Sequence, residues 1–363
     1  MTLSLPHRAE FPARHSALQL LWRILLVAAL ALLIASPAYA DNDETERAPP
    51  APATSAKPGR LDAEKIMGAI VKVETESVPD ARSAESLGTS RSGTGVVIGK
   101  DGLILTIGYL IVEAGSVQVT DGKGRVFPAN VVAYDQATGL GLVRTLVPLD
   151  ATPVAFGDSG KIAERDPVLI LSAGGDGASF AWVVSKRAFT GDWEYHLDSA
   201  LFTSPPTTDW SGAALIDRQG KLVGIGSLVV GKATEGEPSL PGNVFVPIDL
   251  LKPILGDLVR QGHRAGPARP WLGLGADALH GHVFVTKVSP DGPAERAGIA
   301  IGDIILAVGT DPVQTPDELY EHVWAKRQAG DEVPLKVLQG VEVKEIRVRS
   351  IDHLAYFRPH STI

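Results

Sequence analysis

The sequence predicts a mainly β fold in which two six-stranded barrels precede a smaller third unit. Short runs rich in β-branched and aliphatic residues, such as residues 70–75, 94–99 and 103–107, are separated by Gly, Asp and Asn at short spacings. This spacing of short runs and turn residues is typical of all-β barrels and sandwiches. About six runs lie before residue 150 and about six lie between there and residue 248. Two sets of this size favour two barrels.

The first hairpin has the clearest local signal. Lys100-Asp101-Gly102 separates the apolar runs Val96–Ile98 and Leu103–Thr106. Asp-Gly supplies the positive φ values that a tight turn between two strands requires. We therefore expect these two runs to pair as antiparallel strands.

The N-terminal residues 1–40 are predicted to be a secretory signal peptide. Three arginines precede an apolar run, Ile24 to Ser36, which is short for a membrane span. Ala38-Tyr39-Ala40 then fits a signal-peptidase cleavage site. The alternative is an uncleaved N-terminal membrane anchor. Residues 41–60 are rich in Pro, Ala and charge, so we expect a disordered linker. Cleavage would release the mature chain as an exported protein.

Composition excludes several classes of function. The chain has no cysteine, which removes cysteine catalysis, cysteine metal sites and disulfides. Its formal charge of −8 gives no basic surface for nucleic acid, so no nucleic-acid partner is expected. His280-Gly281-His282 lacks a third ligand at metal-binding spacing. We expect neither a metal nor another cofactor.

Residues 61–262 carry several motifs in order. They are a Ser-Gly-Thr-Gly strand from Ser92 with the following Asp-Gly hairpin, the Gly157-Asp158-Ser159 segment, and the strand Val244–Ile248 with a helix expected after an N-cap at Asp249. In these motifs the stretch resembles the HtrA/Deg family of periplasmic, trypsin-like serine proteases, and the resemblance implies two chymotrypsin-like barrels. Ser211, in Ser-Gly-Ala-Ala-Leu, corresponds to the nucleophile of that family.

The remaining positions of the catalytic motif depart from the family. Tyr109 stands at the histidine position and Gly139 at the aspartate position, and no histidine lies between His15 and His196. In the family a glycine stands two places before the nucleophile, and its backbone N–H helps to form the oxyanion hole. Asp209 replaces that glycine here. Such a chain is expected to be a pseudoprotease. The alternative is a serine endopeptidase with residual or unconventional activity through Ser211.

An unconventional base would have to come from another residue. His196 is the only histidine expected in the two barrels, and it lies on or near a strand, where a partly exposed histidine is common. Lys221 follows a Gln-Gly turn, where solvated lysines are common. Neither residue carries a sequence signal that links it to Ser211.

Trp271-Leu272-Gly273-Leu274 stands near the start of residues 263–350. This motif is similar to the loop with which bacterial PDZ domains bind a terminal carboxylate, and residues 263–350 resemble such a domain. Residues 351–363 are predicted to be a C-terminal tail. Thr315 and Glu318 form a capping box around Pro316, and Gly330 is expected to end the helix that begins there. The resemblance implies peptides or protein C-termini as partners, a role in envelope protein quality control, and assembly into a trimer.

Overall fold

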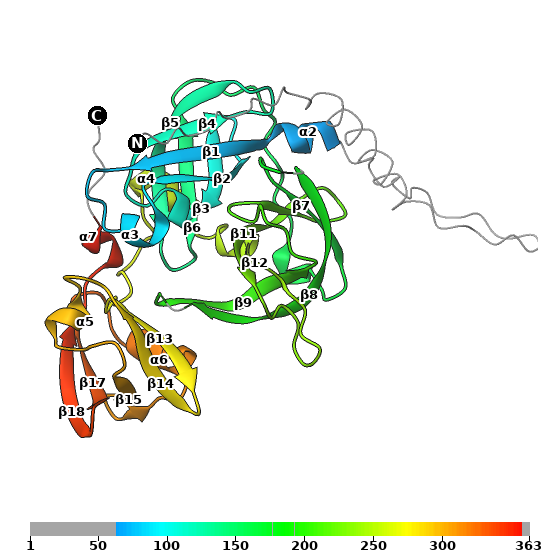
Figure 1. Ribbon diagram of the computed structural model, residues 1–363. Helices are drawn as coiled ribbons and strands as arrows, with labels where there is room; N and C mark the ends of the chain where they lie inside the picture. Colours follow the sequence, from blue (N-terminus) through cyan, green and yellow to red (C-terminus); the bar gives the residue numbers. More distant parts are fainter. Residues whose placement is uncertain (1–62, 176, 192, 358–363) are drawn as a thin grey trace, which may run out of the picture. The chain divides into compact units, whose positions relative to one another are not determined.

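The first barrel consists of six antiparallel strands that close in the order β1-β2-β3-β6-β5-β4. The computed structural model describes residues 63–175, 177–191 and 193–357. In Figure 1 the strands of this barrel run from blue to teal. Their bounds are β1 Ile70–Ser77, β2 Ser90–Val97, β3 Leu103–Ile107, β4 Ala114–Thr120, β5 Val126–Asp135 and β6 Leu140–Thr145. The expected hairpin joins β2 to β3, with Gly102 at φ +78°.

The second barrel, green in Figure 1, closes in the order β10-β11-β12-β9-β8-β7. The predicted mainly β fold with two six-stranded barrels is therefore confirmed. Two long strands, β8 and β9, extend well beyond the length of most of their neighbours. The bounds are β7 Pro167–Leu171, β8 Ala178–Gly191, β9 Tyr195–Ser204, β10 Ala214–Ile216, β11 Leu222–Val230 and β12 Gly242–Pro247.

One apolar cluster is shared by the two barrels. It includes Val71 and Leu105 from the first barrel and Ala200, Ile225 and Val246 from the second, all fully buried. Because burial of apolar side chains is the main favourable term in folding, this common cluster fixes one barrel against the other.

Short helices connect the strands. They are α2 Ala63–Gly68, α3 Ala84–Leu87, η1 Gly108–Leu110, η2 Ser159–Lys161, η3 Ile248–Leu250 and α4 Leu255–Gln261. The expectation that Asp249 caps the helix after the second barrel is wrong, because α4 begins only at Leu255, after Ile254. Pro253 lacks the N–H that would bond to the carbonyl of Asp249, so a helix cannot continue through that turn. Asp249 instead accepts a hydrogen bond from Gly160 N at 2.8 Å.

The third unit is a five-strand path, β13-β14-β15-β17-β18, with the short β16 beside β15. It runs from yellow to red in Figure 1 and has its own apolar core around Val283, Ile305 and Leu335. β13 lies at one end of the path, so one of its edges has no strand partner among the described residues. The bounds are β13 Leu274–Leu279, β14 His282–Val288, α5 Pro293–Arg296, β15 Ile304–Val308, β16 Asp311–Pro312, α6 Pro316–Trp324, β17 Glu332–Gln339, β18 Glu342–Arg349 and α7 His353–Tyr356.

The capping signals of α6 are met at its start but not at its end. Thr315 Oγ1 accepts from Glu318 N at 3.3 Å, and Pro316 is the first helical residue, as expected. The helix ends at Trp324 rather than near Gly330. Gly330 instead donates its N–H to Ser350 O, in the turn before β17.

The predicted signal peptide, residues 1–40, and the predicted linker, residues 41–60, lie outside the described residues. Within the described part of the chain, none of the helices has the length and apolar character needed to cross a membrane.

Candidate functional site

Ser211 lies in the turn between β9 and β10, where the second barrel meets β2 of the first. Its carbonyl accepts from Thr94 N at 2.8 Å, and the next residue, Gly212, has φ +72°. A Cβ atom on Gly212 would clash with Thr94 O, so only glycine fits there. Ser211 Oγ is buried and has no well-formed hydrogen-bond partner among the described residues.

Tyr109 reaches the serine from the first barrel. It is part of η1, directly after β3, and its hydroxyl donates to Ser227 O at 2.9 Å rather than forming a well-aligned bond with Ser211. Burial raises the pKa of Tyr109 to about 12, and polar contacts with Ser211 and Trp210 offset part of that rise. The phenol of Tyr109, at the predicted histidine position, is therefore neutral at pH 7.

A tyrosine from the second barrel lies against Gly139, the predicted aspartate position. Gly139 has φ +72°, and a Cβ atom placed on it would lie 3.1 Å from the hydroxyl oxygen of Tyr195. Tyr195 is buried and donates its hydroxyl to Thr138 O at 2.7 Å. The space of a carboxylate side chain at position 139 is thus occupied by an aromatic ring that has its own hydrogen-bond partner.

Asp209 packs beside the nucleophile turn. Its carboxylate lies against Gly174 and Gly175 in the connection between β7 and β8, so closely that a Cβ atom on Gly175 would clash with Oδ2. Its backbone N–H points to Thr207 Oγ1 at 3.3 Å. An oxyanion hole needs that N–H to be free for the substrate.

His196 and Lys221 have other surroundings. His196 lies on β9, where Nδ1 is 2.7 Å from Thr190 Oγ1 and Nε2 is 3.3 Å from Asp198 Oδ1. Lys221 is exposed, and its backbone N–H bonds to Asp217 in a turn. The structure does not bring either side chain together with Ser211 through any hydrogen bond or ion pair among the described residues.

The loop Trp271–Leu274, hereafter the 271–274 loop, begins the third unit. Trp271 is buried and stacks on His353, with 4.7 Å between the ring centroids. The ring of Tyr356 also packs against it, tilted by 43°, at a centroid distance of 4.6 Å. Gly273 has φ +77°, and a Cβ atom on it would lie 3.1 Å from the Trp271 ring. Residues 353–356, within the predicted tail, form α7 and hold the base of this loop.

A glutamate of the second barrel, which no sequence motif singled out, binds this loop. Glu194, in the connection between β8 and β9, accepts hydrogen bonds from three consecutive backbone N–H groups: those of Leu272, Gly273 and Leu274, at 2.9, 2.6 and 3.0 Å. Burial raises the pKa of Glu194 to about 7, although the three N–H donors favour its charged form. The only sequence signal for this contact is that an acidic residue, Glu194, stands between the aromatic residues Trp193 and Tyr195.

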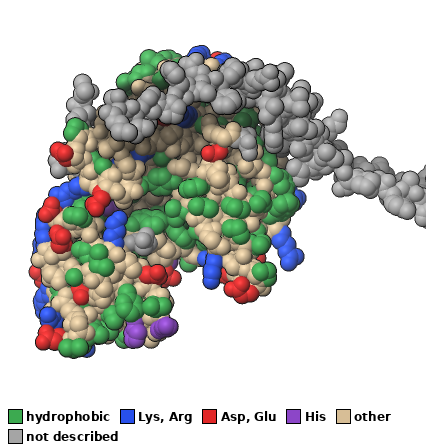
Figure 2. Space-filling view, viewed as in Figure 1, with side chains coloured by type: hydrophobic (Ala, Val, Ile, Leu, Met, Phe, Trp, Pro, Cys, Tyr) green, Lys and Arg blue, Asp and Glu red, His purple; other side chains and the backbone are tan. Residues whose placement is uncertain are grey.

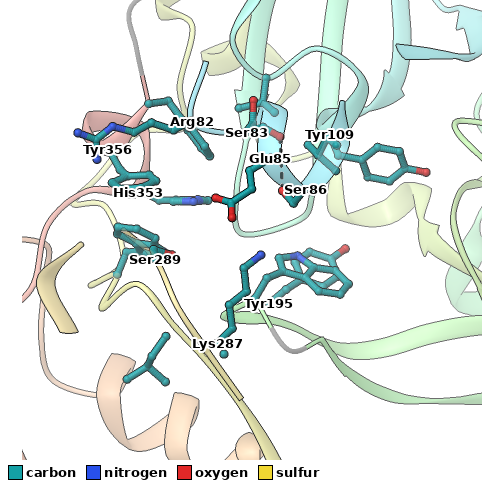
Figure 3. Close-up of a pocket in the computed structure, with 18 of the residues that line it drawn as sticks. Arg82, Ser83, Glu85, Ser86, Tyr109, Tyr195, Lys287, Ser289, His353 and Tyr356 are labelled. Carbon is teal, nitrogen blue, oxygen red and sulfur yellow. Dashed lines mark hydrogen bonds between the residues drawn. The ribbon is translucent and has the colours of Figure 1, made fainter. Parts of the chain in front are cut away.

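A cavity of about 640 Å³ opens beside this contact. Figure 3 shows Tyr109 and Tyr195 of the barrels, together with Lys287, Ser289 and Tyr356, around it. Trp193, which precedes Glu194 in the chain, and Leu274, which donates to its carboxylate, also line the cavity. His280 and His282 lie elsewhere, at the β13–β14 turn, where histidines gather in Figure 2.

Comparisons with known proteins identify both parts of this architecture. Residues 93–225 match the family described as trypsin-like peptidase domain, and residues 270–349 match the PDZ domain family. The chain is a homologue of the HtrA proteases DegS and DegP. It carries a trypsin-like peptidase domain followed by a PDZ domain, as the sequence motifs predicted.

The curated relatives are similar over most of their length. The serine endoprotease DegS of Haemophilus influenzae is 27% identical over 77% of this chain and 83% of its own. The DegS of Escherichia coli K12 is 26% identical over 87% and 90%. Among solved structures, the HtrA-type protease AlgW with decapeptide shares the fold, at a TM-score of 0.50 and 20% identity over 82% of this chain and 98% of AlgW.

Proposed function

We propose that this chain is a pseudoprotease of the HtrA type that binds peptides or protein C-termini through its PDZ domain. The proposal rests on Tyr109, which the sequence motif predicts at the place of the catalytic base. A general base must exchange protons near the operating pH. With a pKa of about 12, roughly one Tyr109 in 10⁵ is ionised at pH 7.

Three further contacts support the loss of peptidase chemistry. Tyr195 fills the place where a carboxylate would orient a base, and Asp209 gives its N–H to Thr207 instead of an oxyanion. Ser211 Oγ is buried, so a substrate carbonyl would have to displace its neighbours. The competing function is a serine endopeptidase that acts through Ser211, since the relatives are named as serine endoproteases.

The PDZ domain offers the remaining chemistry. Its 271–274 loop presents three backbone N–H groups in one direction. β13 begins at the end of that loop, and one edge of this strand has no strand partner among the described residues. A bound peptide would place its terminal carboxylate on the loop and add a strand beside β13, next to α6. We propose the periplasm as its location and envelope protein quality control as its process. A trimer stays a prediction from the family resemblance.

The test is a calorimetric titration of the purified mature chain with a peptide that ends in a hydrophobic residue. The free-acid peptide should bind with a dissociation constant of micromolar order, about −8 kcal/mol. Its C-terminally amidated form should bind at least tenfold more weakly. Gly273→Val should weaken the free acid equally, because Gly273 has φ +77° and faces the Trp271 ring.

A matched control is Gly281→Val. Gly281 has φ +75° but lies in the β13–β14 turn, with no atom close to an added Cβ. That variant bears the same backbone strain and should bind like the wild type. Equal affinity for the acid and the amide would overturn carboxylate capture and favour recognition of internal peptides or a protein surface.

A further inference from the structure

The 271–274 loop already holds a carboxylate, and it belongs to the same chain. Glu194 Oε1 accepts from Gly273 N at 2.6 Å and Leu274 N at 3.0 Å, while Oε2 accepts from Leu272 N at 2.9 Å. Consecutive N–H donors that converge on one carboxylate are the arrangement by which backbone nests capture a peptide C-terminus. Glu194 thus satisfies the donors that an incoming peptide would need.

The backbone around Glu194 is held in an unusual conformation. Its φ is +56°, a region that costs a residue other than glycine about 1 kcal/mol or more. Gln136 Nε2 donates to the carbonyl of Glu194 at 3.2 Å. The N–H of Glu194 donates to the hydroxyl of Tyr320, on α6, at 3.4 Å. Gln136 of the first barrel and Tyr320 of the PDZ domain thus each contact the backbone at this tip.

The charge of Glu194 depends on the loop. The residue is only 2% exposed, and no Lys, Arg or His among the described residues lies within ion-pair distance of its carboxylate. A buried carboxylate without a cation must be satisfied by hydrogen bonds, and here all of them come from residues 272–274. The same donors cannot serve a second carboxylate at the same time.

We propose that Glu194 is an internal ligand that caps the peptide site of the PDZ domain, and that a peptide C-terminus binds by displacing it. The inference rests on the proposed function of that site. The cavity of about 640 Å³ beside Trp193 and Tyr195 leaves one side of the tip unpacked, so the tip has room to move when the carboxylate is exchanged.

Two variants and a control test the cap in the full mature chain. Glu194→Gln keeps the shape but removes the charge, and Glu194→Ala removes the acceptor. Asp198→Asn changes a fully exposed carboxylate on the same hairpin, on β9. Amide hydrogen exchange at residues 272–274 should be at least tenfold faster in Glu194→Ala than in the wild type or in Asp198→Asn. Thermal unfolding confirms that each variant is folded.

Titration with the free-acid peptide gives the second readout. Glu194→Gln and Glu194→Ala should bind at least tenfold more tightly than the wild type, with Asp198→Asn unchanged. Unchanged exchange at residues 272–274 in Glu194→Ala, or equal affinity of the wild type and both Glu194 variants, would overturn the cap while the peptide-binding function stands. If no protein, including Glu194→Ala, prefers the acid over the amide, the proposed function itself fails.

Discussion

Single residues decide the chemistry that this fold can perform. The sequence allowed the prediction that Tyr109 and Gly139 take the triad positions, because each stands at a fixed distance from recognisable strand motifs. It could not show that the ring of Tyr195, from the second barrel, fills the space beside Gly139. That contact joins two residues that lie far apart in the chain, and no local pattern encodes it.

This contact predicts the result of an attempt to restore the triad. The double variant Tyr109→His, Gly139→Asp should not digest casein. An aspartate at φ +72° is strained, and its Cβ would press on the Tyr195 hydroxyl, so the side chain cannot reach the histidine. We expect a loss of about 1–3 kcal/mol in the free energy of unfolding. Denaturant unfolding and casein turnover are the measurements.

Tyr109→His alone is the control, since it introduces the imidazole without the strain at Gly139. It should lose less stability and should be equally inactive. Brisk turnover by the double variant would mean that Tyr195 and Asp209 yield to a restored triad, so that neither residue blocks serine chemistry.

Among the elements, the strands were predictable and several helix ends and connections were not. Both barrels follow from local alternation and turn residues. The start of α6 follows from Thr315 and Pro316, whereas the linker helix α4 begins at Leu255, well after the expected cap at Asp249, because Pro253 interrupts the turn. The carboxylate of Glu194 reaches Leu272 across 78 residues, so the sequence alone could not predict the capped loop.

The linker after α4 is tied to the first barrel by one ion pair. Arg264 Nε and Nη2 each lie 2.6 Å from a carboxylate oxygen of Asp135, which is 4% exposed and also accepts from Thr138. Arg264→Ala should lower the free energy of unfolding by about 2 kcal/mol, because a buried carboxylate loses its cation while Thr138 continues to donate. Urea denaturation measures the change.

Arg260→Ala is the matched control for this prediction. Arg260 pairs with Asp257 within α4, and its side chain is 71% exposed. Exposed pairs of this kind contribute little, so the loss should stay below about 0.5 kcal/mol. Equal losses in the two variants would show that the Asp135 pair does not anchor the linker.

The whole molecule combines a trypsin-like peptidase domain with a PDZ domain, and one glutamate joins them. The shared apolar cluster fixes the two barrels, while α7 supports the 271–274 loop through Trp271. The fold is that of the HtrA relatives, and we propose that Tyr109, Gly139 and Asp209 leave Ser211 without its catalytic partners. The proposed binding function therefore depends on the 271–274 loop, whose backbone N–H groups are bonded to Glu194 of the second barrel.

The pseudoprotease proposal requires that Ser211 is not a working nucleophile. Intact mass measurement after incubation with a fluorophosphonate probe examines the serine itself, because the probe labels an activated serine without the need for a substrate. We expect the wild type and Ser211→Ala both to keep their unmodified mass at neutral pH. Stoichiometric labelling of the wild type that is absent in Ser211→Ala would overturn the pseudoprotease proposal and identify the chain as a serine hydrolase.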